Sequence, residues 1–157
     1  MSIFKPYKQI GVVFDEDFDA IFKSGIRGII FDIDNTLVED NAPLDNRATE
    51  FVLNLKKRGY KISVVSNNDI DRVKEFCNPL DIKFVYNAKK PSKAGYLKAM
   101  ILMGTNKSNT ISIGDQIFTD ICGANRAGIK SYLCEPINLK TERKHIKLKR
   151  IFEKIIN

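Results

Sequence analysis

The chain of 157 residues has only three cysteines, Cys77, Cys122 and Cys134, and they form no CxxC pair. An odd, scattered set of cysteines argues against a structural zinc site and is typical of a reduced, intracellular protein. No apolar run approaches transmembrane length, and the N-terminus lacks the apolar core of a signal peptide. We therefore expect a cytoplasmic protein, at most peripheral to the inner face of a membrane.

Internal repeats, low-complexity segments and linkers rich in Gly and Ser are also absent, so we expect one domain over residues 1–157. Apolar residues make up 43% of the chain, which argues against a wholly disordered protein. The charge is unbalanced, with a net value of +7. Such an excess favours anionic partners: phosphorylated small molecules, acidic lipid or nucleic acid.

Strand and helix patterns alternate after an N-terminal lead-in of residues 1–26. That lead-in carries a short helix, which Asp15 or Asp17 would cap. We expect strands at 27–33, 61–66, 82–86, 109–113 and 129–134, and helices at 45–57, 69–77, from after Pro91 to about Met103, and at 119–127. Five strands joined by helical crossovers predict an α/β fold, a parallel, doubly wound sheet with helices on both faces.

Residues 141–157 are expected to form a basic amphipathic C-terminal helix. Its apolar stripe consists of Leu148, Ile151, Phe152, Ile155 and Ile156. We expect this stripe to pack on the domain, and a position on an anionic membrane is the alternative. His145, the only histidine, is far in sequence from the acidic segments and is interpreted as a surface residue.

The first strand is an almost continuous apolar run that ends in two acids, Asp32 and Asp34. A run of this kind is typical of a central strand covered on both faces. Carboxylates at its end are costly to bury unless a cation accompanies them. The alternative is a strand that simply ends in a polar turn.

Other polar residues follow the remaining strands. They are Ser66 and Asn67 after the second strand, Lys89, Lys90 and Lys93 after the third, and Asp115 and Asp120 after the fourth. Because the carboxyl ends of parallel strands meet at one edge of the sheet, we expect these side chains to converge there. Each also has a simpler explanation: Asp120 at a helix start, Ser66 in a turn, and any single lysine on the surface.

Together these groups suit phosphoryl transfer through an aspartyl-phosphate. Asp32 would attack phosphorus, and Asp34 would protonate the leaving oxygen and then deprotonate water. These two roles require opposite protonation states at the first step. Ser66 would bind phosphoryl oxygens while Lys90 offsets their charge. Mg²⁺ is the expected cofactor, since it prefers oxygen ligands.

With these residues, the sequence resembles the haloacid dehalogenase superfamily of phosphatases. DIDNT at 32–36 resembles the DxDxT motif, VVSN at 64–67 the second motif, KKP at 89–91 the lysine motif and GDQIFTD at 114–120 the GDxxxxD motif. The resemblance implies that Asp32 is the nucleophile and Asp34 the acid and base. It also implies phosphate binding by Ser66, Asn67 and Lys90, and a metal site of Asp32, Asp34, Asp115 and Asp120. Lys90 is preferred because it directly precedes Pro91, but Lys89 and Lys93 remain open.

More narrowly, the chain resembles the YqeG-type group of subfamily IIIA, which is related to the mitochondrial phosphatidylglycerophosphate phosphatase. This resemblance implies a Rossmann-like fold and cleavage of a phosphate monoester. The spacing between motifs leaves no room for a cap domain, so an open site would suit a bulky anionic substrate such as a phospholipid. A phosphatase acting on nucleotides or nucleic-acid ends is one alternative. A non-catalytic module that binds RNA, a ribosome or a membrane is another.

Overall fold

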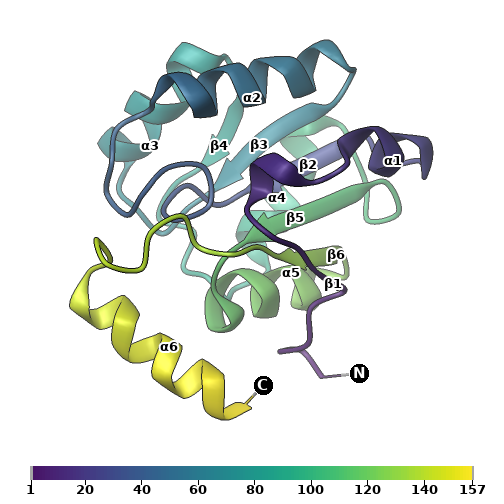
Figure 1. Cartoon of the computed structure of the whole chain (residues 1–157). Helices are drawn as coiled ribbons and strands as arrows, with labels where there is room; N and C mark the ends of the chain where they lie inside the picture. The colour runs from purple at the N-terminus through teal and green to yellow at the C-terminus, as the bar shows by residue number, and fades with distance from the viewer. Residues whose placement is uncertain (1, 157) are drawn as a thin grey trace.

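A parallel sheet lies at the centre of the computed structural model, which describes residues 2–156. Within these residues it has six strands in the order β1-β6-β5-β2-β3-β4 (Figure 1). Their bounds are Lys8–Gln9 (β1), Gly28–Phe31 (β2), Lys61–Val65 (β3), Lys83–Val85 (β4), Thr110–Gly114 (β5) and Lys130–Leu133 (β6). The predicted doubly wound α/β fold is confirmed.

The predicted count of five strands is wrong because the lead-in contributes a sixth, β1. Lys8 pairs with Tyr132 and Gln9 with Leu133, in parallel with β6 at the edge of the sheet. Both β1 residues are exposed. A two-residue polar strand has no alternation of apolar side chains, so no periodic pattern predicts it.

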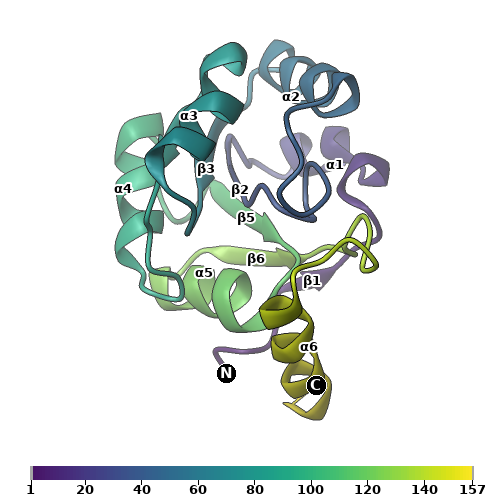
Figure 2. The ribbon, with the colours of Figure 1, turned by 90° about the vertical axis from the view of Figure 1, so that its left-hand side faces the viewer.

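Helices cover both faces of the sheet (Figure 2). Their bounds are Phe18–Lys23 (α1), Asn46–Lys57 (α2), Ile70–Cys77 (α3), Ala94–Met103 (α4), Cys122–Ala127 (α5) and Lys144–Ile156 (α6), with 3₁₀ turns at Val13–Asp15 and Asn78–Leu80 and a π-helical turn at Ile117–Ile121. On β2, Ile29 and Phe31 pack into the core that α1, α2 and α3 cover, whereas Ile30 packs beneath α4 and α5. The apolar run of the first strand is therefore buried on both sides, as predicted.

Aspartates begin three of these helices. Asp17 accepts a hydrogen bond from the amide of Ala20 (3.0 Å), Asp45 from that of Ala48 (2.8 Å) and Asp69 from that of Arg72 (2.9 Å). Each carboxylate satisfies an amide that has no partner inside its helix. Of the two candidates for the cap of α1, Asp17 is the one that acts.

The chain order creates a crevice at the carboxyl edge of the sheet. β2 lies between β5 and β3, and the chain moves outward from β2 through β3 to β4 on one side and from β5 to β6 on the other. The loops after β2 and β5 therefore diverge, which is where ligands bind in open α/β sheets. Among the described residues, the connections from β2 to β3 and from β3 to β4 hold loops, the helices α2 and α3 and one 3₁₀ turn, and no cap domain is evident.

The C-terminal arm, residues 135–156, returns over this edge and ends in α6 (Figure 1). Polar contacts hold it: Arg143 pairs with Asp40 at 3.0 Å, and Glu153 accepts a hydrogen bond from the amide of Phe118 at 3.0 Å. Arg150 donates to Asp115 and to Glu142. The arm is thus fastened to the domain largely through charged side chains.

The apolar stripe of α6 faces solvent, so the expectation that it packs on the domain is wrong. The helix buries Ile146 and Glu153 instead. The exposed stripe comprises Leu148 (57%), Ile151 (59%), Phe152 (55%), Ile155 (76%) and Ile156 (53%). Periodicity identifies the apolar face of a helix but not the face that packs, and here the buried ion pairs decide the orientation. No helix within residues 2–156 is both long and apolar enough to span a bilayer.

Candidate active site

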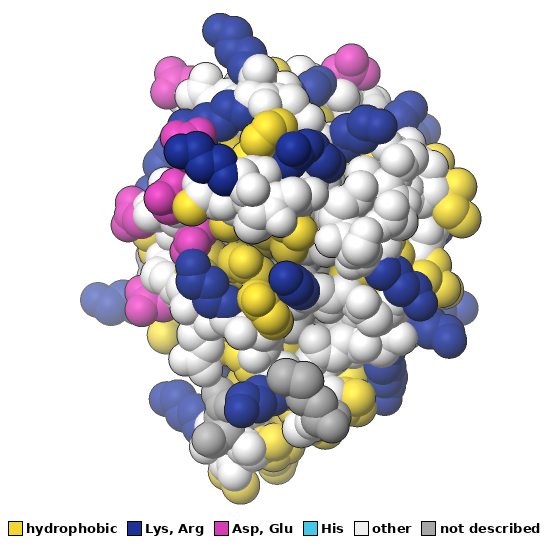
Figure 3. Space-filling view, turned by 90° about the vertical axis from the view of Figure 1, so that its right-hand side faces the viewer, with side chains coloured by type: hydrophobic (Ala, Val, Ile, Leu, Met, Phe, Trp, Pro, Cys, Tyr) yellow, Lys and Arg dark blue, Asp and Glu magenta, His cyan; other side chains and the backbone are white. Residues whose placement is uncertain are grey.

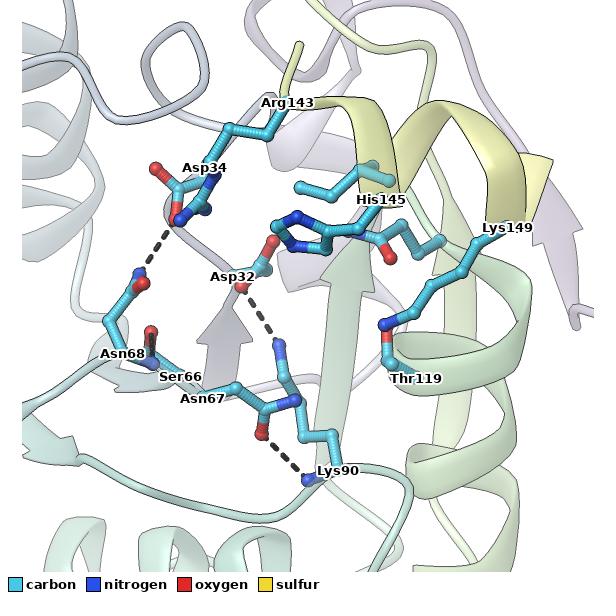
Figure 4. A pocket seen from close by; sticks show the side chains of 12 residues that line it. Asp32, Asp34, Ser66, Asn67, Asn68, Lys90, Thr119, Arg143, His145 and Lys149 are labelled. Carbon is cyan, nitrogen blue, oxygen red and sulfur yellow. Dashed lines mark hydrogen bonds and ion pairs between the residues drawn. The ribbon is translucent and has the colours of Figure 1, made fainter.

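A buried lysine bridges two aspartates that follow different strands of the sheet. Lys90 Nζ donates to Asp32 Oδ1 at 2.8 Å (Figure 4). It also donates to Asp120 Oδ1 at 2.6 Å. Its side chain is 4% exposed, whereas Lys89 and Lys93 are exposed residues. Asp32 itself follows β2 directly, and its amide extends the ladder to the carbonyl of Ile113 at 3.1 Å. Of the three candidate lysines, Lys90 is therefore the one that reaches the acids.

Three carboxylates gather beside this lysine. Asp32, Asp115 and Asp120 each place an oxygen within 4.8 Å of the others, and all three residues are buried. Arg150 donates to Asp115 from the C-terminal arm, and Thr36 Oγ1 donates to the same side chain at 3.3 Å. The carboxylate of Asp34 lies outside this group. The structure thus brings together three of the four predicted metal ligands.

The charges in this cluster do not balance. Four buried carboxylates face two cations in the described chain: Asp32, Asp115, Asp120 and Glu142 against Lys90 and Arg150. Glu142 Oε2 also has no hydrogen-bond partner within residues 2–156. Uncompensated carboxylates are costly to bury. The donor set consists of oxygens and lacks two positive charges, so it fits a divalent cation such as Mg²⁺.

A glycine and a π-helical turn bring Asp120 back to the strand end. A Cβ atom on Gly114 would lie 2.4 Å from Cβ of Asp120, so a larger residue would displace this carboxylate. The turn Ile117–Ile121 precedes α5, and Asp120 Oδ2 accepts the amide of Gln116 at 3.1 Å. Sequence reasoning predicted an ordinary helix from Thr119. This prediction is wrong at the start of the helix, because a π turn has no distinctive pattern of apolar residues in the sequence. Such turns recur at functional sites.

Asp34 occupies a different environment from Asp32. Its carboxylate accepts hydrogen bonds from the Asn68 side chain (2.7 Å), the Asn41 amide (2.8 Å) and Arg72 (3.1 Å). Burial alone would raise the pKa of Asp34, but these donors together hold it below its usual value. With protein charges alone, Asp34 is therefore ionised at neutral pH.

The pKa values of Asp32 and Asp115 shift in the opposite direction from that of Asp34. Burial, followed by the charge of Asp120, raises the pKa of Asp32 well above its usual value despite Lys90. Burial and Asp120 likewise raise the pKa of Asp115 to about 7. Burial would lower the pKa of Lys90, but the charges of Asp120 and Asp32 outweigh it and raise this pKa. Lys90 therefore stays protonated, while the carboxylates are short of positive charge.

The loop after β3 lies beside Asp32 and forms one wall of a pocket. Ser66 is 1% exposed, and its Oγ accepts the amide of Asn68 at 3.1 Å. Asn67 Oδ1 accepts the amide of Lys90 at 2.7 Å, which holds the lysine loop against this turn. All three predicted phosphate ligands, Ser66, Asn67 and Lys90, line the same pocket as Asp32.

This pocket has a volume of about 200 Å³ above Asp32 (Figure 4). Residues of the C-terminal arm line it as well: Arg143, His145, Ile146 and Lys149. His145 is exposed, as predicted, but it borders the site from which its position in the sequence seemed to separate it. Asn68, Arg72, Arg143 and Arg150 were missed as site residues. Asn68 adjoins Ser66 and Asn67, which was a usable signal, whereas the arginines stand in helical segments of ordinary composition.

Comparisons with known proteins agree with this geometry. The family described as haloacid dehalogenase-like hydrolase matches residues 41–134. The chain is 37% identical over 137 residues to the probable phosphatase YqeG of Bacillus subtilis, covering 87% of this chain and 80% of that protein. It is 29% identical over 141 residues to the chloroplastic/mitochondrial phosphatidylglycerophosphate phosphatase 1 of Arabidopsis thaliana, covering 80% of this chain and 39% of that protein.

Among solved structures, the fold is similar to the cobalt-bound form of a deoxy-D-mannose-octulosonate 8-phosphate phosphatase from Haemophilus influenzae. The TM-score is 0.59 at 17% identity, with 80% of this chain and 75% of that chain covered. At this identity the likeness bears on the fold alone.

Proposed function

Because the chain belongs to the haloacid dehalogenase-like hydrolase family and is a phosphoric monoester hydrolase, we propose that it acts with Mg²⁺ through a phosphoryl-aspartate at Asp32. The observation that carries this proposal is the ion pair of Asp32 with the buried Lys90 beside two further carboxylates. Lys90 is positioned to offset the charge of a phosphoryl group brought to Asp32. The proposal therefore rests on side chains that follow three separate strands, β2, β4 and β5.

Asp32, Asp115 and Asp120 would hold the metal ion. A bound divalent cation would supply positive charge to the phosphoryl oxygens and lower the pKa of nearby carboxylates. The raised pKa of Asp32 makes this second effect necessary, because only the carboxylate form is a nucleophile. Thr36 and Arg150 would orient Asp115 through their hydrogen bonds.

In the first step, a carboxylate oxygen of Asp32 forms a bond to phosphorus as the bond to the leaving oxygen breaks. Asp34 gives that oxygen a proton. In the second step, water attacks phosphorus, Asp34 takes its proton and the bond to Asp32 breaks, which releases inorganic phosphate. Ser66 and Asn67 would bind phosphoryl oxygens from the opposite wall of the pocket.

Asp34 must be protonated before the first step, although its surroundings lower its pKa. Substrate binding would reverse this shift, because a phosphate dianion brought beside Asp34 disfavours a second negative charge there. The negative charge of the substrate would also attract the Arg143 guanidinium, which lies 3.8 Å from Asp34 Oδ2, and so weaken its interaction with Asp34. Asp34 would thus take up the proton required for the leaving group only when a substrate is bound.

Metal removal tests the cofactor. After chelation we expect release of phosphate from p-nitrophenyl phosphate to fall at least about 100-fold, and Mg²⁺ to restore it. Mg²⁺ should also raise the melting temperature of the wild-type protein but not that of Asp115→Asn, which loses one of the gathered carboxylates. Full turnover after chelation, or an equal thermal shift in Asp115→Asn, would contradict the metal site.

For the substrate, we propose a phosphorylated lipid presented at an anionic membrane surface. The name of the Arabidopsis relative supports a phospholipid that carries a phosphate monoester. The exposed apolar stripe of α6, which belongs to the same arm as the pocket residues Arg143 and His145, supports a membrane as the place of reaction. An apolar helix face of this kind can enter the boundary between headgroups and acyl chains.

Charge favours a lipid surface over a second copy of the chain. The cations of α6 other than Arg150 are exposed, namely Lys144, Lys147, Lys149 and Lys154, and its one acid, Glu153, is buried. A symmetric dimer through this stripe would bring lysines against lysines, whereas each lysine near an anionic bilayer contributes about 1 kcal/mol. Elsewhere the basic side chains are scattered: on the face shown in Figure 3 they form no continuous stripe, and hydrophobic side chains gather at its lower end.

Vesicle binding tests this partner. We expect wild-type protein to co-sediment with vesicles that contain phosphatidylglycerol, and the double variant Ile151→Glu/Phe152→Glu to bind at least about tenfold more weakly. Ile101→Glu is the matched control, because Ile101 is 79% exposed on α4 and lies outside α6. Equal binding by both variants would contradict a role for α6. A wild-type dimer that the double variant abolishes would assign the stripe to a second copy, and faster release of phosphate from oligonucleotide ends than from vesicles would favour the nucleic-acid alternative.

A further inference from the structure

The C-terminal arm builds a wall of the pocket, and of this wall the proposed reaction uses only Arg143. Ser66 and Asn68 border Asp32 on one side, and His145 and Lys149 of α6 border it on the other (Figure 4). Lys149 extends from the helix toward Thr119 in this view. The arm lies beyond residues 41–134, which the family match covers. This wall, like Asp32 and Asp34, therefore lies outside the matched residues.

The cations of this wall differ in how they are engaged. Arg143 forms two hydrogen bonds of 3.0 Å with Asp40, whose side chain is 1% exposed. Lys149 and His145 form no ion pair or side-chain hydrogen bond within residues 2–156, although they border a pocket that contains Asp32 and Asp34. Arg143 thus serves to fix the start of α6, while Lys149 remains available to a ligand.

The arm is held firmly enough to present these groups. Arg150 donates to the backbone carbonyl of Asp115 at 2.9 Å and also to its side chain, one turn of helix from Ile146. Asn35 donates to Glu142 at 3.1 Å and accepts the amide of Asn138 at 3.0 Å, which ties the arm to the loop of Asp32 and Asp34. A side chain on a fixed element binds more tightly than one on a free tail, because less conformational entropy is lost.

We propose that Lys149, with His145 beside it, forms a subsite for a second anionic group on the leaving group of the substrate. The inference rests on the proposed function, since Asp32 and Lys90 take the phosphate that is cleaved. The phosphate that is cleaved contacts Asp32, Lys90 and Ser66. Lys149, on the other side of the pocket from Ser66, then faces the remainder of the substrate. The substrates concerned are phosphate monoesters whose leaving group bears a second phosphate, a phosphodiester or a carboxylate.

Matched soluble substrates test the subsite. Alkanediol bisphosphates of several chain lengths are compared with the corresponding alkanediol monophosphates, and preference is the ratio of their kcat/KM values. We expect wild type to prefer one length of bisphosphate, and Lys149→Ala to lower that preference about tenfold through KM rather than kcat. Lys149→Arg should keep most of it. Lys147→Ala, which removes an exposed charge outside the pocket on the same helix, should leave the preference unchanged.

The outcomes separate this subsite from the reaction itself. If wild type hydrolyses neither substrate with Mg²⁺, the proposed function fails. If it hydrolyses both and Lys149→Ala leaves the preference intact, or if Lys147→Ala lowers it equally, the subsite is overturned. A bisphosphate anchored in a vesicle separates lipid-borne from free sources: an effect of Lys149→Ala confined to vesicles would also overturn the subsite, because Lys149 would then act by attracting the membrane.

Discussion

Replacing Asp32 by asparagine is expected to lower turnover of phosphate monoesters by at least about 10⁴-fold, which is typical of losing a nucleophile. An amide oxygen is far less nucleophilic than a carboxylate and would not form the acyl phosphate. The variant should nevertheless fold. Lys90 keeps a carboxylate partner in Asp120 at 2.6 Å, so no cation is left buried alone.

The measurement is the steady-state release of phosphate with Mg²⁺, together with the melting temperature. Asp71→Asn is a suitable control, because Asp71 is an exposed acid in the first turn of α3 and lies outside the pocket. It should match wild type. Turnover by Asp32→Asn within tenfold of wild type would exclude Asp32 as the nucleophile.

Replacing Lys90 by alanine is expected to have the largest effect on stability. Its side chain is 4% exposed and forms ion pairs with two buried carboxylates. Breaking a buried ion pair by removing one partner destabilises a protein by about 3–5 kcal/mol. For a chain of this size, that loss corresponds to a decrease in melting temperature of roughly 6–20 °C. Turnover should also fall, because the phosphoryl charge loses its cation.

Lys93→Ala is the matched control, since Lys93 is an exposed lysine of the same segment. Thermal unfolding of both variants should be measured with and without Mg²⁺. We expect Mg²⁺ to stabilise Lys90→Ala more than wild type, because it would supply charge to Asp32 and Asp120. Equal melting temperatures for Lys90→Ala and Lys93→Ala would show that the cluster does not depend on Lys90.

The edge of the sheet was predictable because it depends on local patterns. Apolar runs that end in Asp32 and Asp34, in Ser66 and in Asp115 each identify a strand and its carboxyl end, and a parallel sheet brings those ends together. Among the three lysines after the third strand, Lys90 was preferred because it directly precedes Pro91, and Lys89 and Lys93 stayed open. The fold decides for Lys90, whose side chain is 4% exposed and pairs with Asp32 and Asp120.

The contacts of the C-terminal arm were beyond sequence reasoning. Arg150 and Asp115 are separated by 35 residues, and nothing in the helical pattern of 144–156 distinguishes a buried arginine from a solvated lysine. The apolar stripe is conspicuous in the sequence, and it suggested the wrong packing face. Orientation here depends on long-range ion pairs with Asp115 and Asp40, which have no periodicity to read.

Acid quenching tests most directly whether Asp32 carries the phosphoryl group during turnover. The protein is mixed with Mg²⁺ and a ³²P-labelled phosphate monoester, stopped in acid within the first turnover, and digested for mapping by mass spectrometry. We predict a phosphoryl group on Asp32 that hydroxylamine removes, and none in Asp32→Asn. A labelled group on another residue, or rapid turnover with no labelled protein at any time, would contradict the mechanism.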